Sequence, residues 1–397
     1  MKMNFSFGSL FLLILVALIS IVLYDPDGSG DEAAKDDLIG KFSYNLKKWH
    51  AKGNYFMYKD QHKIFYVHEE KEDDEAEQMM MRRRNENNLS KAAPKRGEIE
   101  NEDDVAIGAE EEEERKSSSI TIVFLHGFPT SSYDYYRLWN LFSSNHAQLG
   151  QNELKQYKRI SFLAFDYLGY GFSDKPANYD YSIFDMADMT ERLLIHLNVK
   201  SVILIAHDVG DTVAQEIIRR DNLKNQIHFS IEKLILLNGG IINGVYKPML
   251  SQHLLLNKFV GNLFGKYFFK YFFFKHSFSQ VFGSFMKPNA TDMYDFFLSI
   301  KYNQGNRVLF KTINYMNERT EYGSVWYDAL NETTRPTMFI YGPADPINPR
   351  DTFPKHLLQD IPHIKLRVLS DPIGHYPQYE DSFTVFSLIK HFFSSSS

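Results

Sequence analysis

The segment SVILIAHDVGDTVAQEIIRR, residues 201–220, decides the fold. It begins with a short apolar run that is typical of a buried strand, and from Val213 to Arg220 it has the spacing of a helix. Small residues, Ala206 and Gly210, stand two places before and two places after Asp208. A tight turn that lifts one side chain above the end of a strand needs small residues at these places. The segment therefore predicts a strand, a sharp turn with Asp208 at its apex, and a helix.

Short apolar runs of the same kind recur along the chain, together with helical patterns at Tyr181 to His196 and Phe383 to Phe393. Strands that are apolar throughout and alternate with helices are typical of a parallel sheet covered on both faces. The predicted fold class is therefore α/β with a mostly parallel central sheet. The predicted parallel strands are Ile120–Leu125, Ile160–Phe165, Val202–Ala206, Ile231–Leu237, Thr337–Tyr341 and Leu366–Leu369; an antiparallel pair, Asn54–Tyr58 and Lys63–Val67, precedes them.

The strand pattern stops between about Gly239 and Thr334, where the spacing is helical and aromatic residues are frequent, as in FGKYFFKYFFFKHSF. We interpret this segment as a helical cap inserted into the sheet. Its aromatic side chains could pack within the cap or line an apolar substrate pocket. A third interpretation is contact with a membrane through Phe268, Phe269, Phe272, Phe273 and Phe274.

The N-terminal residues are different in kind, because Leu10 to Leu23 (LFLLILVALISIVL) are nearly all aliphatic. With the residues in front of it, this run approaches the roughly 20 residues that cross a bilayer. No small-x-small cleavage site precedes Tyr24, so an uncleaved anchor is favoured over a cleaved signal peptide. Lys2 before the run and acidic residues after it place the N-terminus in the cytosol and the remaining chain in the lumen. Secretion after cleavage is the alternative.

Residues 69–119 form a charged stretch of low complexity that includes EEKEDDEAE and EEEEERKSSS. Such a stretch cannot bury enough apolar surface to become ordered. We interpret it as a solvated surface insertion, and a partner-binding segment is the alternative. The predicted organisation is an anchor or signal (1–24), a lumenal linker (25–50), a first core part (51–68 and 120–238), a charged disordered insertion (69–119), a helical cap (239–334) and a second core part (335–397).

Composition excludes several classes of function. The net charge of −6 and the pI near 6.2 give no basic surface for nucleic acid. The chain has no cysteine, so disulfides, thiolate metal sites and a cysteine nucleophile are excluded. No G-x-S-x-G motif occurs, so a serine-hydrolase mechanism lacks its nucleophile.

Asp208 is the candidate nucleophile. A carboxylate at the apex of the turn can attack an electrophilic carbon and form an alkyl ester, which activated water then hydrolyses. This chemistry suits epoxides and alkyl halides. The other interpretation is that Asp208 only caps the helix that follows it.

The other catalytic candidates also follow predicted strands. His126-Gly127-Phe128-Pro129 follows one strand, and the backbone N–H groups of Phe128 and Val209 are the candidate oxyanion donors, with His126 supporting the loop. His375 stands between the last strand and the final helix, where a general base belongs. Asp345 is the candidate acid that orients the imidazole, in the chain order nucleophile, acid, histidine. Asp371, nearer in sequence, is interpreted as a turn cap.

Five segments together carry a family resemblance: HGFPTSSYDYY (126–136), DYLGYGFSDKP (166–176), HDVGDTVAQE (207–216), YGPADPINP (341–349) and GHYPQYED (374–381). The chain resembles the epoxide hydrolase and haloalkane dehalogenase branch of the α/β-hydrolases. More closely, it resembles the mesoderm-specific transcript proteins, over about Ile120 to Asp381. The resemblance implies an α/β-hydrolase fold and a place at the endoplasmic reticulum membrane, whereas the charged insertion departs from the family pattern.

The resemblance also concerns proton donors and leaving groups. Epoxide hydrolases use two cap tyrosines, and Tyr315 stands where one of them falls, while the other has no match. Dehalogenases usually have a tryptophan where this chain has Val209, and often a halide-binding asparagine where it has Phe128. The resemblance therefore favours epoxide opening over dehalogenation, although Val209 also differs from the aromatic residue usual in epoxide hydrolases.

The resulting hypothesis is a membrane-anchored hydrolase of the epoxide-hydrolase type that acts on an apolar or lipid-like substrate. Asp208 forms the ester, His375 activates water, Asp345 orients His375, and Tyr315 protonates the leaving oxygen. No metal and no organic cofactor are expected, because water is the only second substrate. The alternative is a catalytically weak or inactive hydrolase-fold protein that regulates lipid storage at the endoplasmic reticulum.

Overall fold

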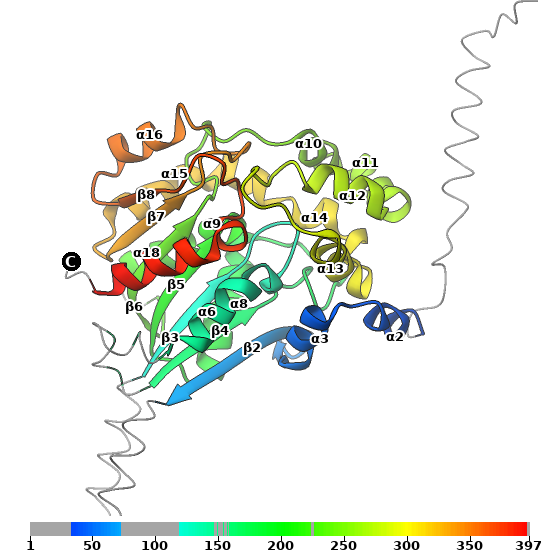
Figure 1. Ribbon diagram of the computed structural model, residues 1–397, viewed down its shortest axis with the longest axis horizontal. Coiled ribbons are helices and arrows are strands. Elements are labelled where there is room, and N and C mark those ends of the chain that lie inside the picture. The colour runs from blue at the N-terminus through cyan, green and yellow to red at the C-terminus, as the bar shows by residue number, and fades with distance from the viewer. Residues whose placement is uncertain are drawn as a thin grey trace, which may run out of the picture.

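The computed structural model describes residues 33–72, 119–146, 149, 154, 157, 159–223 and 226–394. Within them the chain forms one eight-stranded sheet in the order β1-β2-β4-β3-β5-β6-β7-β8 (Figure 1). The strands from β3 to β8 are parallel, and β2 pairs antiparallel with both β1 and β4. The strands are β1 (Asn54–Tyr58), β2 (His62–Glu72), β3 (Ser119–Leu125), β4 (Arg159–Phe165), β5 (Ser201–His207), β6 (Ser230–Leu237), β7 (Thr337–Tyr341) and β8 (Lys365–Val368).

Helices cover this sheet, and α6 packs against α18 while α8 packs against α9. The helices of the core are α2 (Ala33–Gly40), α3 (Tyr44–Ala51), η1 (Ser132–Tyr135), α6 (Tyr136–Ser144), α8 (Ile183–His196), α9 (Val209–Asn222), α16 (Phe353–Asp360), α17 (Pro377–Glu380) and α18 (Ser382–Ser394). Between β6 and β7 stand α10 (Leu250–Leu256), α11 (Lys258–Leu263), η3 (Phe264–Phe268), α12 (Tyr271–Phe278), α13 (Ala290–Lys301), η4 (Tyr302–Arg307), α14 (Leu309–Thr312) and α15 (Tyr315–Glu332). Figure 1 shows α10 to α14 together at the end of the molecule opposite α16 and β8.

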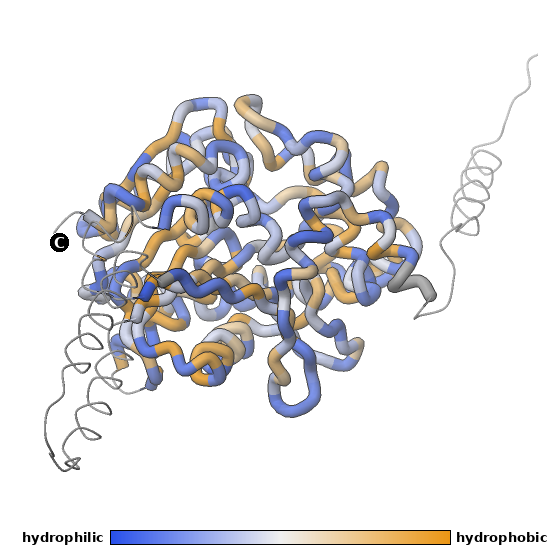
Figure 2. Tube along the Cα trace, turned by 60° about the horizontal axis from the view of Figure 1, so that its bottom comes forward, coloured by the Kyte–Doolittle hydropathy of each residue, from blue (hydrophilic) through white to orange (hydrophobic). Residues whose placement is uncertain are grey.

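The central strands are apolar because both faces of the sheet are covered. Every residue of β5 is buried, and β3 and β4 are buried apart from their first residues. Figure 2 shows hydrophobic segments in the interior and hydrophilic segments mainly along the outline. In a parallel sheet the carboxyl ends of the strands meet at one edge, where ligands usually bind. The loops after β3, β5, β6, β7 and β8 therefore open at the same edge of the sheet.

All eight predicted strands are present, which confirms the prediction of a mostly parallel α/β sheet. The α/β-hydrolase fold is likewise the observed fold class. Helix α9 begins at Val209, four residues earlier than its apolar spacing predicts, because the helix starts directly at the turn. No strand interrupts the described residues from 238 to 336.

The prediction that disorder begins at Glu69 was wrong. Residues 69–72 belong to β2 and pair with β4. Burial alone would raise the pKa of Glu69, but hydrogen bonds from Lys71, Ser143 and Lys52 outweigh it and lower that pKa to about 2. Ser143 and Lys52 come from other parts of the chain, so the local charge density gave no sign of them. Residues 73–118 lie outside the described part of the chain.

The predicted linker is also in part a packed helix. Leu46 and Trp49 of α3 are buried, and Trp49 Nε1 donates a hydrogen bond to Ser132 Oγ at 3.3 Å. The backbone N–H of Ser43 donates to Asp295 Oδ1 at 3.1 Å, which ties the start of α3 to α13. The predicted anchor, residues 1–24, lies outside the described residues. Among the helices that the structure does describe, none combines the length and the apolar character needed to cross a membrane.

Candidate active site

Asp208 stands at the apex of the turn between β5 and α9 with φ 51° and ψ −105°. A Cβ added at Gly210 would lie 2.2 Å from the Leu125 carbonyl oxygen, so only glycine lets α9 approach β3 this closely. A Cβ added at Gly127 would likewise lie 2.8 Å from the Asp208 Cβ. The small residues around the turn therefore hold the Asp208 side chain at the edge of the sheet, where it is 3% exposed.

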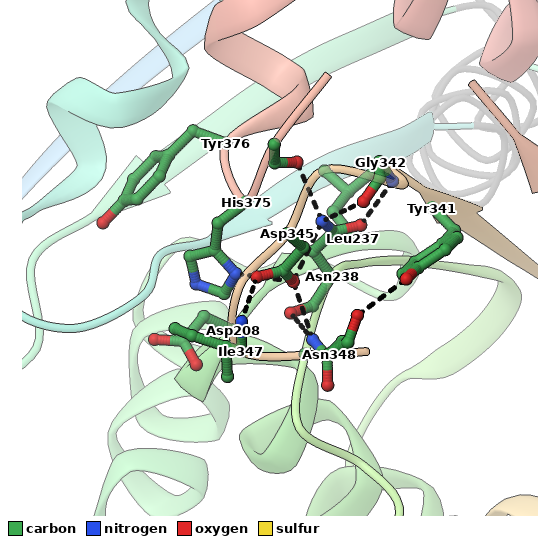
Figure 3. A network of polar contacts seen from close by, with 12 residues as sticks. Asp208, Leu237, Asn238, Tyr341, Gly342, Asp345, Ile347, Asn348, His375 and Tyr376 are labelled. Atoms are coloured by element: carbon green, nitrogen blue, oxygen red, sulfur yellow. Dashed lines mark hydrogen bonds and ion pairs between the residues drawn. The ribbon is translucent and has the colours of Figure 1, made fainter. Parts of the chain in front are cut away.

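His375 and Asp345 meet at the same edge from the loops after β8 and β7 (Figure 3). The distance between His375 Nδ1 and Asp345 Oδ2 is 3.0 Å. Because an ionised carboxylate only accepts, Nδ1 carries the hydrogen and Nε2 is left as the basic nitrogen. Burial lowers the pKa of His375, but Asp345 and the nearby Asp208 outweigh burial and raise it above the ordinary value. The arrangement stabilises a charged imidazolium.

Asp345 is fixed by four hydrogen bonds in all. Besides His375, its carboxylate accepts from Asn238 Nδ2 at 3.1 Å, Asn348 Nδ2 at 2.9 Å and the Ile347 N–H at 2.8 Å. Asn238 follows β6 at φ 48° and also donates to the Gly374 carbonyl at 2.9 Å. One asparagine therefore joins the loop of the acid to the loop of the histidine, as Figure 3 shows.

Glu380 binds the backbone of the loop that carries His375. The Glu380 carboxylate accepts hydrogen bonds from the N–H groups of Gly374 at 2.9 Å, Tyr376 at 3.1 Å and Gly283 at 2.9 Å. Gly283 belongs to the segment between β6 and β7, so this carboxylate connects the cap to the histidine loop. Burial raises the pKa of Glu380 to about 7 in spite of these donors.

The Asp208 carboxylate has two partners of different kinds. Its Oδ2 accepts from the N–H of Phe128, one of the two predicted oxyanion donors, at 3.0 Å. No hydrogen bond joins the carboxylate to the N–H of Val209, the first residue of α9, although both residues are described and buried. On its other side, Oδ1 lies 3.5 Å from Arg319 Nη2.

Arg319 is the main residue of the site that the sequence did not reveal. It lies on α15, is 4% exposed, and donates to the Asp208 carbonyl at 2.9 Å and to Thr212 Oγ1 at 2.8 Å. Burial would raise the pKa of Asp208, but the Arg319 guanidinium and His375 outweigh burial and lower it. Arg319 therefore keeps a deeply buried carboxylate ionised. The one signal for it was its place one turn after Tyr315 on the same helix.

Tyr315 is buried, with 1% of its surface exposed, close to the site. Its ring lies 4.7 Å from the guanidinium carbon of Arg319 and 5.7 Å from the ring of Phe128. Its hydroxyl accepts a hydrogen bond from Gln252 Nε2 at 3.2 Å. Burial and the nearby Asp208 raise the pKa of the hydroxyl well above its ordinary value, so Tyr315 keeps its proton.

A cavity of about 100 Å³ lies between the strand ends and the cap. Asp208, His375 and Phe128 line it from the core, and Gln252 and several phenylalanines line it from the cap. Apart from Asp208 and His375, the lining contains no carboxylate, lysine, arginine or histidine. Tyr315 is not part of this lining and stands behind Gln252. The reactive groups therefore face an apolar space that suits an apolar ligand.

Other candidates have structural roles. Asp371 is exposed and pairs with Arg350 at 2.9 Å, away from the imidazole of His375. His126 Nε2 accepts from the Tyr167 N–H at 3.1 Å, and burial lowers the pKa of His126 to about 4, so a neutral imidazole supports the loop after β3. Within the described ranges no group of three histidine or acidic side chains is arranged to hold a metal ion.

Comparisons with known proteins agree with this architecture. The model of the α/β hydrolase fold family matches residues 120–382. The chain is 37% identical over 262 residues to the mesoderm-specific transcript homolog protein of Bos taurus, an alignment covering 66% of this chain and 74% of that protein.

Two solved structures share the fold. The epoxide hydrolase CorEH has a TM-score of 0.55 and 16% identity, with 86% of this chain and 98% of that chain covered. The haloalkane dehalogenase DatA of Agrobacterium tumefaciens C58 also has a TM-score of 0.55, with 17% identity and coverage of 70% and 89%. At such identities the likeness shows the fold and not the reaction.

Proposed function

Because the chain belongs to the α/β-hydrolase fold family and, within it, to the mesoderm-specific transcript proteins, we propose that it is a hydrolase of the epoxide-hydrolase type with an apolar, lipid-like epoxide as substrate. One observation carries the proposal. The carboxylate of Asp208 faces an apolar cavity that it shares with His375, whose Nδ1 is bound by Asp345. This is the set of groups that forms and then hydrolyses an alkyl ester.

In the first step an oxygen of Asp208 attacks an epoxide carbon, the bond from that carbon to the epoxide oxygen breaks, and an ester forms. Arg319 favours this step by keeping the buried carboxylate ionised. The released alkoxide needs a proton, which we assign to Tyr315. Because Gln252 supplies the hydrogen bond that the Tyr315 hydroxyl accepts, the tyrosine proton is free for another acceptor.

In the second step His375 Nε2 takes a proton from water, and the resulting hydroxide adds to the ester carbonyl carbon. The bond from that carbon to the alkyl oxygen then breaks, and the imidazolium gives its proton to the leaving alkoxide, which departs as the diol. The carboxyl proton left on Asp208 restores the Tyr315 hydroxyl, and Asp208 returns to its ionised form.

We assign stabilisation of the negative oxygen formed in this step to the N–H groups of Phe128 and Val209, and the support is the 3.0 Å hydrogen bond from the Phe128 N–H to Asp208 Oδ2. The imidazolium is stabilised by Asp345. The negative charge of Asp208 is one cause of the raised pKa of His375. Esterification removes this charge, so the imidazolium of His375 loses its proton more easily and the neutral base is available for the second step.

The two residues at the usual halide-binding positions support an epoxide more than a halide. A halide ion leaves without a proton and needs N–H donors to hold it. Beside Asp208 the chain has the apolar side chains of Val209 and Phe128, so no side chain there donates to a halide. An epoxide oxygen needs one proton instead, and Tyr315 lies one residue behind the cavity wall.

A second candidate function is a weak or inactive hydrolase-fold protein that regulates lipid storage. The burial of Tyr315 behind Gln252 favours it, because a proton donor outside the cavity lining cannot reach a substrate without movement. For both functions we propose attachment to the endoplasmic reticulum membrane through residues 1–24, with the domain in the lumen and secretion as the alternative. The support is the apolar run from Leu10 to Leu23 and the charges around it.

A single turnover in H₂¹⁸O, with the protein in excess over a lipid epoxide, tests the proposed chemistry. The ester mechanism predicts that the first diol carries ¹⁶O, taken from Asp208, and that the peptide containing Asp208 gains ¹⁸O. Direct attack by water would instead put ¹⁸O into the first diol and leave Asp208 unlabelled. The peptide containing the exposed Asp371 is the matched control and stays unlabelled. Absence of turnover over a broad panel of epoxides would favour the second candidate.

A further inference from the structure

Exposed apolar side chains are concentrated in one short segment of the cap. More than half of the exposed large hydrophobic side chains in the described chain lie within residues 250–286. Within residues 250–286 the most exposed side chains are those of Phe259 at 80%, Leu250 at 76% and Phe272 at 74%. They belong to α11, α10 and α12, which Figure 1 shows together at one end of the molecule. Single exposed apolar residues need no explanation, but a cluster of this kind marks a surface that is covered by something.

The spacing of these residues shows that α10 and α11 are apolar on their outer faces. Leu250 and Leu254 stand four residues apart on α10, and Phe259 and Leu263 stand four residues apart on α11. Residues four apart lie on the same side of a helix. The buried Leu255 faces the interior, so α10 is apolar on both sides. A helix that only covers a core normally has a polar outer face.

The cap segment also differs from the rest of the chain in its charged residues. From Lys233 to Thr291 the chain contains no aspartate and no glutamate, although its net charge is −6. Lys258, Lys266 and Lys275 stand among the apolar residues and are exposed. Lysines that form ion pairs, such as Lys41, Lys52, Lys59 and Lys71, come from other segments. The cap therefore combines an apolar face with positive charge and no acidic residue.

This surface continues into the cavity. Phe273 of α12 is 47% exposed and is also one of the residues that line the cavity around Asp208. Its neighbour Phe272 is exposed and does not belong to the lining. An apolar molecule that leaves a lipid phase at Phe272 would thus meet Phe273 and then the cavity.

We propose that the cap docks on an anionic lipid surface through a cap face formed by Leu250, Leu254, Phe259, Leu263, Phe272 and Phe273 with Lys258, Lys266 and Lys275. The aromatic and aliphatic side chains enter the boundary between headgroups and acyl chains, and the lysines bind lipid phosphates. The pairing of an acid-free basic segment with exposed phenylalanines identifies a negatively charged lipid surface as the partner. Docking does not depend on any reaction at Asp208, so it goes beyond the proposed hydrolysis.

The absence of cysteine makes the test direct, since one introduced cysteine can be labelled alone. We would attach an environment-sensitive nitrobenzoxadiazole probe to Phe272→Cys in the full chain, and in a second variant to Phe259→Cys. The matched control is Val368→Cys, because Val368 is 57% exposed on β8 at the opposite end of the molecule. Each protein is mixed with vesicles of phosphatidylcholine, with and without phosphatidylserine. A predicted N-terminal anchor affects all three positions alike, so the comparison isolates the cap.

Docking predicts a blue shift of the probe at positions 272 and 259 with anionic vesicles, quenching there by nitroxide-labelled lipid, and neither effect at position 368. Replacing Lys258, Lys266 and Lys275 with glutamate weakens the response, by about fivefold in partitioning for each positive charge lost. The proposal is overturned if position 272 responds no more than position 368. It is equally overturned if neutral vesicles give the same shift, or if the shift appears without vesicles as the protein associates with itself.

Discussion

The loops at the strand ends and the helices of the cap meet at one cavity but hold their residues in opposite ways. Asp345 is fixed by four hydrogen bonds from its own loop and two neighbouring loops, and Asp208 is fixed by a backbone turn. In the cap, one side-chain hydrogen bond from Gln252 holds the Tyr315 hydroxyl. The groups of the proposed ester chemistry are therefore held rigidly by the loops of the sheet. Substrate entry and proton donation depend on cap helices, where a single hydrogen bond holds the proton donor.

The largest effect is expected where the sheet holds the acid. Asp345→Asn should slow hydrolysis of the alkyl ester by about 10³- to 10⁴-fold, because a neutral amide neither fixes the tautomer of His375 nor stabilises the imidazolium. Formation of the ester should change little, since it does not use the base. Rapid-quench measurement of both steps separates them. Asp371→Asn is the control, and an equal loss in both steps of Asp345→Asn would contradict the assigned role.

Arg319 lies on the cap helix α15 but contacts Asp208 at the end of β5. Replacing Arg319 therefore tests whether the catalytic groups of the sheet depend on the cap. Arg319→Met should slow ester formation by about 10²-fold and destabilise the fold by about 3 to 5 kcal/mol, because it leaves the Asp208 charge buried without its partner. Arg319→Lys keeps the charge and should recover part of the rate. Stopped-flow alkylation and chemical denaturation measure the two effects.

The pH dependence of Arg319→Met distinguishes charge from packing. The native pKa of Asp208 lies below its unfolded value, so its stabilising contribution is present above the unfolded pKa and is lost as the pH falls through the native pKa. Without Arg319 the pKa of Asp208 rises. When the pH is lowered, the rate of ester formation should therefore begin to fall at a higher pH in the variant than in the wild type. An unchanged pH profile together with a slower rate would mean that Arg319 acts only through packing.

A smaller effect should come from the proton donor of the cap. Tyr315→Phe should slow ester formation from an epoxide by about 10- to 100-fold. The rate with an alkyl bromide of similar shape should be unchanged, because bromide leaves without a proton. Tyr327→Phe on the same helix is the matched control, since its hydroxyl donates to Asp360 at the surface. Equal losses with both substrates would assign Tyr315 a structural role.

The smallest effect concerns stability at the contact between the two regions. Glu380→Gln loses an acceptor for one of three buried N–H groups and should cost about 1 to 3 kcal/mol. The native pKa of Glu380, about 7, exceeds its ordinary value, so the folded state holds the proton more tightly and wild-type stability should decline as the pH rises from about 4.5 to about 7. The decline should shrink in the variant. Denaturation across this pH range tests it, and identical slopes would contradict the contribution of Glu380.

The sequence predicts the sheet side of the molecule well because its signals are local. Apolar runs mark the strands, and parallel strands bring their carboxyl ends to one edge, so the residues after each strand become neighbours. This reasoning selected Asp208, Asp345 and His375, which the structure brings to one edge of the sheet. It did not select Asn238 and Asn348, although both follow strands, because no local pattern shows that Asn238 binds Asp345 or that Asn348 joins Asp345 to the Asn238 carbonyl.

The cap was less predictable for a physical reason. Helical spacing identifies an apolar helix face, but it does not show which side chain of the helix contacts the loops at the strand ends. The sequence therefore did not identify Arg319. The same limit explains α3 and residues 69–72, whose order depends on partners distant in sequence. Charge density and composition describe a segment in isolation, whereas these segments are ordered by contacts with the rest of the fold.

The most direct test of the account is intact-protein mass spectrometry of His375→Ala after exposure to a panel of lipid epoxides. Without the base, ester formation should continue while hydrolysis slows, so the protein should gain the mass of one epoxide on the peptide that contains Asp208. The double variant Asp208→Asn with His375→Ala should gain nothing. Contradiction would come from a folded His375→Ala protein that forms no adduct with an epoxide that the wild type turns over, or from an adduct on another residue.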